Sequence, residues 1–140
     1  MRDVNIKAVT LGVLVSLAVV LVLSAILFAV FGGHLLDTGM GDAEFETAVN
    51  ALLLSPAVMF WTFAAGAVAT VLGAYTTARI ARGALFQNTV AFLGVSFVLS
   101  LLVSDSSYPL WAEVVSYLLM PPSAYAGVYL ASRPGVGRRG

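Results

Sequence analysis

Residues 8–31 form an apolar run that strongly limits what this chain can fold into. The run consists mostly of Val, Leu and Ala and contains no charged residue. About 20 apolar residues are enough to cross the hydrocarbon core of a bilayer, and this run is longer than that. Three further apolar runs follow at 56–81, 84–103 and 110–132. Lipid offers the backbone no hydrogen-bond partner, so each run is predicted to be a membrane-spanning helix.

The amino-acid composition agrees with a membrane protein. Hydrophobic residues make up 60% of the 140 residues and charged residues only 10%, whereas soluble domains carry roughly a quarter charged residues. Four spans nearly exhaust a chain of this length. We therefore expect one transmembrane domain over residues 1–140, folded as an all-α integral membrane four-helix bundle.

The charged residues are sorted along the chain. All seven cations lie at the start, the centre or the end, and six of the seven acids lie in the segments between. Because short cytoplasmic loops retain Lys and Arg, this order predicts that both termini and the central loop are cytoplasmic. A bacterial or archaeal cell membrane is the expected location. The first run is expected to be an uncleaved span, since it exceeds the core of a signal peptide.

The first segment between the spans carries an amphipathic pattern. Phe45, Ala48, Val49 and Leu52 follow the i, i+3, i+4, i+7 spacing of one helical face. Asp42 is a suitable N-cap for such a helix. The pattern predicts a short amphipathic helix on the outer membrane surface. The alternative is an outward extension of the following span.

Small residues recur at helical spacing in two of the runs. Such stripes let the backbones of membrane helices approach closely, so they are interpreted as helix-packing faces rather than as a ligand groove. The predicted packing residues are Gly66, Thr70, Gly73 and Thr77 in the 56–81 run, and Ser123, Gly127 and Ala131 in the 110–132 run.

The last run contains a candidate ion or proton site. Glu113, Tyr117 and Pro121 share one helical face, and Pro121 with Pro122 removes two backbone donors. The helix is therefore predicted to be kinked or broken there, with carbonyl groups exposed beside an acid and a phenol. The simpler interpretation places Glu113 in the first turn, where it offsets the helix macrodipole.

Three arginines form a second candidate site. Arg79, Arg82 and Arg133 are all predicted at the inner surface, where they could bind a lipid phosphate. The simpler interpretation is that they anchor the topology and extend to water. The chain has no cysteine and one histidine, His34, which lacks the spacing of a metal site. No metal, cofactor, nucleic-acid partner or catalytic motif is predicted, so we expect a non-enzyme.

A short motif occurs twice. Gly-x-Tyr-x-x-x-Arg ends the second run at residues 73–79 and the fourth run at residues 127–133. A duplicated helical hairpin would explain the motif, and chance repetition in an apolar chain is the alternative. The first copy, in GAYTTARIARG, resembles a group of small bacterial four-helix membrane proteins with Gly-x-Tyr-x-x-Ala-Arg at their inner hairpin. The matching residues are Gly73, Tyr75, Ala78, Arg79 and Ala81, with Ala74 where a second glycine is common. The resemblance implies the topology and no activity.

Two functions remain open from the sequence. The first is a non-catalytic multi-pass membrane protein that associates with itself or with a larger membrane complex through its small-residue faces. The alternative is a small oligomeric transporter or channel that uses the kinked last helix. Glu113, Tyr117 and the two prolines should face the bundle interior in the second case and lipid or the wet interface in the first.

Overall fold

The computed structural model of this chain describes residues 4–81, 84–103 and 108–133, and this part of the chain is helical without strands. Four long helices are apolar enough to cross a membrane, which confirms the predicted all-α architecture. A short 3₁₀ helix and a twelve-residue helix lie between the first two. The elements are α1 (Ile6–Phe31), η1 (Gly33–Asp37), α2 (Asp42–Leu53), α3 (Pro56–Ala81), α4 (Leu85–Val103) and α5 (Leu110–Ser132).

Local sequence signals explain where several helices begin. The side chain of Asn5 caps α1, because its Oδ1 atom accepts a hydrogen bond from the backbone N–H of Ala8 at 3.1 Å. Pro56 is the first residue of α3, the position that tolerates a missing N–H. Helix α2 has Gly41 at its N-cap, and Asp42, predicted as the cap, is instead its first residue. There the acid still lies at the positive end of the helix dipole.

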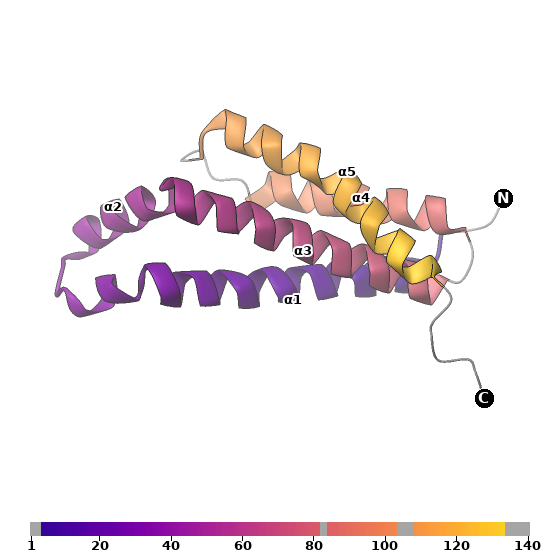
Figure 1. Cartoon of the computed structure of the whole chain (residues 1–140), viewed down its shortest axis with the longest axis horizontal. Helices are drawn as coiled ribbons and strands as arrows, with labels where there is room; N and C mark the ends of the chain where they lie inside the picture. Colours follow the sequence, from indigo (N-terminus) through magenta and orange to yellow (C-terminus); the bar gives the residue numbers. More distant parts are fainter. Residues whose placement is uncertain (1–3, 82–83, 104–107, 134–140) are drawn as a thin grey trace.

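The four long helices run in alternating directions, and α3 lies between α1 and α5 (Figure 1). The start of α1 and the ends of α3 and α5 lie at the same end of the bundle, called here the arginine end because it carries Arg79 and Arg133 (Figure 1). Helix α2 lies at the opposite end, the α2 end, where α1 and α3 diverge (Figure 1). The two ends are therefore packed differently.

The half of the bundle near the arginine end contains the core. Its buried cluster consists of Val9, Val13, Ala74, Phe92 and Ala124, contributed by all four long helices. Aliphatic side chains gain little by leaving lipid, so such a core depends on close packing of matching surfaces.

Glycines bring the backbones together within this core. A Cβ atom added at Gly73 would lie 2.8 Å from the carbonyl oxygen of Gly12, so α1 and α3 cross nearly backbone to backbone. A Cβ atom added at Gly127 would overlap the carbonyl oxygen of Val71, so α3 and α5 do the same. Thr77 is fully buried at the first of these crossings, and its hydroxyl donates to the Gly73 carbonyl at 3.0 Å.

A buried amide links the starts of α1 and α4. Asn88 is only 1% exposed, and its Oδ1 atom accepts a hydrogen bond from the backbone N–H of Asn5 at 2.7 Å. Its Nδ2 atom donates to the carbonyl of Ala84 at 3.0 Å. A buried polar group is stable in an apolar interior only when it is hydrogen-bonded, as Asn88 is here.

Helix α5 does not break at its proline pair. Residues Leu110–Ser132 form one continuous helix with Pro121 and Pro122 inside it, so of the predicted kink or break, the break is wrong (Figure 1). Each proline removes a single backbone hydrogen bond, while the turns on both sides keep theirs. Buried contacts of Ala112 and of Gly127, on either side of the prolines, hold the two halves of α5 to the bundle.

Candidate functional site

A cavity of about 730 Å³ lies in the half of the bundle near the α2 end. It forms because α1 diverges from α3 beyond the glycine crossing, so the helices no longer fill the space between them (Figure 1). Residues of α1, α3, α4 and α5 line its walls, and α2 contributes to its rim. A volume of this size is typical of small-molecule sites, which commonly enclose 300–1,000 Å³.

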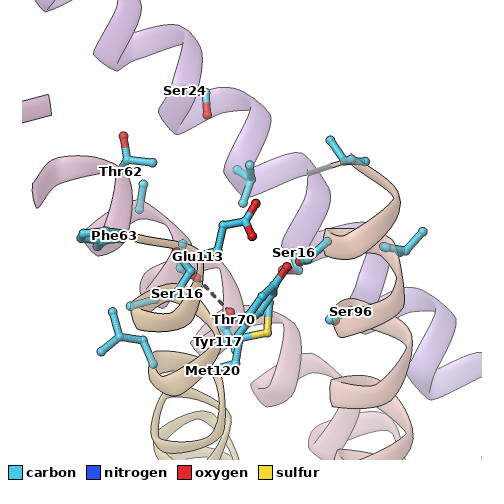
Figure 2. A pocket seen from close by; sticks show the side chains of 18 of the residues that line it. Ser16, Ser24, Thr62, Phe63, Thr70, Ser96, Glu113, Ser116, Tyr117 and Met120 are labelled. Carbon is cyan, nitrogen blue, oxygen red and sulfur yellow. Dashed lines mark hydrogen bonds between the residues drawn. The ribbon is translucent and has the colours of Figure 1, made fainter. Parts of the chain in front are cut away.

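Glu113 and Tyr117 extend into this cavity from α5 (Figure 2). Among the described residues that line it, Glu113 is the only charged side chain. The ring of Tyr117 packs edge-on against Phe97 of α4, with centroids 4.9 Å apart, which orients the phenol. The cavity therefore combines one acidic group with one positioned aromatic ring.

Hydroxyl groups on several helices face the same space (Figure 2). Thr62, Thr70 and Ser116 each donate their hydroxyl hydrogen to the carbonyl four residues earlier in their own helix, at 2.9 Å in each case. A hydroxyl has one donor and two acceptor lone pairs, so these three groups retain only acceptor capacity. These three hydroxyls therefore favour ligands that donate hydrogen bonds.

The structure brings together part of the predicted ion or proton site. Glu113 and Tyr117 line the cavity, but Pro121 and Pro122 are exposed on the surface of α5 and do not line it. The acid and the phenol of the predicted site therefore share the cavity, while the two proline rings lie outside its lining. Glu113 also lies in the first turn of α5, so the dipole interpretation and the cavity position hold together.

The predicted packing stripe of α3 divides into two parts. Gly73 and Thr77 are buried against α1 at the glycine crossing. Gly66 instead faces open space, and both it and Thr70 line the cavity. Gly66 is therefore not packed against α1 within this chain, because α1 has already diverged from α3 at that level.

The stripe predicted on α5 is buried only at Gly127. Gly127 is buried against α3, as a packing residue should be. Ser123 is only half-buried, and its neighbour Ala124 is the fully buried residue of that turn. Ala131 is half-buried and lines a second, shallower cavity at the arginine end.

Sequence reasoning missed two contributions from α1. Gly12 forms the closest approach to α3, although the sequence drew attention only to the small residues of the later runs. Ser16 and Ser24 line the cavity, and neither was singled out from the sequence as a site residue. Their shared helical face with Val13 and Val20 was a detectable signal, but nothing in the run shows which neighbour that face meets.

Two of the candidate lipid-binding arginines each contact a tyrosine on their own helix. The guanidinium of Arg79 lies 5.6 Å from the centre of the Tyr75 ring, and that of Arg133 lies 4.7 Å from the Tyr129 ring. Arg133 also donates to the Tyr129 hydroxyl at 3.0 Å. This i, i+4 cation–π pair explains the spacing of the repeated motif.

Among the described residues, Arg79 and Arg133 do not line one common pocket. Arg79 borders the second cavity with Ala78, Leu85, Ala131 and Ser132, and Arg133 is not among the residues that line it. Arg79 and Arg133 are both exposed. Arg82 lies outside the described residues.

Within the described residues, no group of three or more His, Asp or Glu side chains could hold a metal ion. Comparisons with protein-family models, with curated proteins and with solved structures find no match to this chain. The function is therefore argued from the cavity and from the arrangement of the helices around it.

Proposed function

We propose that this chain is a non-catalytic multi-pass protein of a cell membrane that binds a small molecule in its cavity and carries it across the bilayer. Both termini are cytoplasmic in this proposal, since Lys7, Arg79 and Arg133 lie at the same end of the bundle. The cavity then lies in the outer half of the bundle, and the glycine crossings fill the inner half.

One observation carries the proposal: Glu113 and Tyr117 face a cavity between the helices (Figure 2). An acid next to a span is costly unless it lies at water or in a polar cavity, and such acids commonly belong to ligand or ion pathways. Of the two functions that the sequence left open, transport is the one that requires these side chains to face the interior.

The other function, association through small-residue faces, has less support. Gly73, Thr77 and Gly127 are buried by contacts within one chain, so they do not present a free surface to a second copy. Gly94 on α4 is exposed with open space around it. It is the feature that favours association, because a small residue on a lipid-facing helix lets another helix approach.

The proposed topology is also compatible with the duplicated hairpin, with the resemblance to small membrane proteins and with a lipid phosphate at Arg79. A duplicated hairpin would place a Tyr–Arg pair at the end of both α3 and α5, where the guanidinium groups lie 5.6 Å and 4.7 Å from the tyrosine ring centres. The resemblance to small bacterial four-helix membrane proteins rests on the first of these segments. A lipid phosphate at the exposed Arg79 is compatible with transport, because Arg79 and the 730 Å³ cavity lie in opposite halves of the bundle.

Transport is tested with proteoliposomes that hold one of three aromatic solutes: the cation ethidium, the anion carboxyfluorescein or the neutral phenyl glucoside. At least one solute should leave vesicles containing the wild-type protein faster than it leaves protein-free vesicles. Gly66→Leu places a side chain inside the cavity without a clash at its Cβ atom, so it should slow that release by about tenfold, as loss of a ligand site does.

Gly94→Leu is the matched control, because Gly94 also has open space around it but does not line the cavity. Its release rate should equal that of the wild-type protein. If no solute leaves faster than from protein-free vesicles, or if both variants slow release equally, the cavity is not a transport site.

A further inference from the structure

We propose that the cavity is selective for lipophilic organic cations, such as an ammonium group attached to an apolar body. This inference rests on the proposed function, because it specifies the ligand class of the same cavity. Three properties of the lining support it: the sign of its charge, the direction of its hydrogen-bonding capacity, and its size with its apolar walls.

The charge of the described lining has one sign. Glu113 supplies a carboxylate, and none of the Lys or Arg side chains in the described residues lines the cavity. An opposite charge brought close to this group in surroundings of low dielectric constant is attracted more strongly than in water. An anion would instead meet the like charge of Glu113.

Three hydroxyl groups on the lining also favour a cation over an anion. Thr62, Thr70 and Ser116 have each donated their hydroxyl hydrogen to their own helix and keep only lone pairs for a ligand. An ammonium group has donors and no acceptors, so it matches these groups. An anion needs donors, and these three hydroxyls no longer supply them.

The size and the apolar surface exclude a bare inorganic cation as the best fit. The volume of about 730 Å³ is that of a site for a drug-sized molecule. Apolar side chains such as Phe63, Leu99 and Met120 form much of the wall. A hydrated metal ion would leave these side chains against water, whereas an organic cation covers them with its apolar body.

Aromatic rings add a cation-binding element. The Tyr117 ring lines the cavity on the same helix as Glu113 and one turn further along it, and Phe63 lines the wall from α3 (Figure 2). Organic cations bind over the faces of such rings, with the greatest gain where water is excluded. The carboxylate and the rings therefore favour the same ligand class.

The test compares tetraphenylphosphonium with tetraphenylborate, two ions of similar shape and opposite charge. Binding of each radiolabelled ion to the full-length protein is measured by equilibrium dialysis in neutral detergent micelles. The wild-type protein should bind the phosphonium at least about tenfold more tightly than the borate, and Glu113→Gln should remove most of this difference. Glu46→Gln is the matched control, because Glu46 is exposed on α2 and does not line the cavity.

A second variant keeps the test decisive if Glu113→Gln does not fold. Tyr117→Leu keeps an apolar side chain and removes a ring that lines the cavity, so it should weaken phosphonium binding by about threefold while changing borate binding less. Equal binding of the two ions, or phosphonium binding that neither variant changes, would overturn the inference. Tighter binding of the borate would also overturn the proposed cation selectivity, but it would still support a ligand site in the cavity. Binding of neither ion, with no solute released in the transport assay, would remove both proposals.

The same measurement identifies the source of the cation. Phosphatidylethanolamine carries an ammonium group, whereas phosphatidylglycerol does not. If added phosphatidylethanolamine displaces the phosphonium and phosphatidylglycerol does not, the cation is a lipid headgroup. If neither lipid displaces it, the cation is a free organic molecule. Both outcomes support selectivity for organic cations.

Discussion

Gly127 and Gly94 are both helical glycines within apolar runs, yet their surroundings are opposite. A Cβ atom at Gly127 would overlap the Val71 carbonyl and lie 3.0 Å from the Tyr75 nitrogen, both of which are backbone atoms that cannot rotate away. A Cβ atom at Gly94 would meet nothing within 4 Å. The position relative to a neighbouring helix, rather than the residue type, decides what each glycine does.

We predict that Gly127→Ala destabilises the protein by about 1–3 kcal/mol, the usual effect of adding a methyl group to a filled interior. Thermal unfolding in detergent, followed by loss of the monodisperse chromatographic peak, measures the change. Gly94→Ala is the control and should be neutral or slightly stabilising, since Ala is the better helix former. Equal melting temperatures for the two variants would show that α3 and α5 do not pack backbone to backbone.

The cavity-lining residues of α5 and its proline pair lie at different levels along the helix. Glu113 and Tyr117 line the cavity, while Pro121 and Pro122 are exposed one turn beyond Tyr117. Because the prolines do not contact the cavity and the helix continues through them, their effect is limited to the backbone of α5. They are therefore expected to influence stability more than ligand binding.

Replacing both prolines, Pro121→Ala with Pro122→Ala, should raise the melting temperature. Each interior proline removes a backbone hydrogen bond and crowds the preceding turn, an effect that reaches about 3 kcal/mol in a helix interior. Binding of tetraphenylphosphonium should stay within about twofold of the wild-type value, too small a change for a lost contact. Lower stability together with lost binding would indicate that the prolines shape the cavity.

The two halves of the bundle are packed differently. Close contacts of Gly12, Gly73 and Gly127 fill the half near the arginine end, and α1 diverges from α3 in the other half, which holds the cavity (Figure 1). The proposed topology places the cavity in the outer half of the membrane. Transport would require the helices to separate at the glycine crossings, so that the cavity also reaches the other side. Which side it faces first depends on which end of the bundle is cytoplasmic.

The topology can be measured directly because the chain contains no cysteine. Thr47→Cys, on the exposed side of α2, should react with a membrane-impermeant maleimide added to intact cells. Ser132→Cys, exposed at the end of α5, should react only after the membrane is permeabilised. The opposite pattern would invert the protein, and the cavity would then lie in the cytoplasmic half of the membrane.

The apolar runs and the residues at their ends determined where the helices form. Runs longer than a bilayer is thick leave the backbone no alternative to internal hydrogen bonds, so helix formation there is a local property. Pro56 sets the start of α3, and the predicted ranges 56–81 and 110–132 coincide with α3 and α5. The amphipathic spacing of Phe45 and Leu52 likewise anticipated α2, in which both residues are half-buried.

The cavity depends on how the helices sit against one another, which no single run encodes. Gly66 and Gly73 belong to the same stripe, but α1 contacts α3 at Gly73 and has diverged from it at Gly66. Glu113 could equally have faced water or lipid, and only the placement of α5 turns it toward α1 and α3. In a membrane every apolar face is compatible with lipid, so periodicity alone does not show which faces meet.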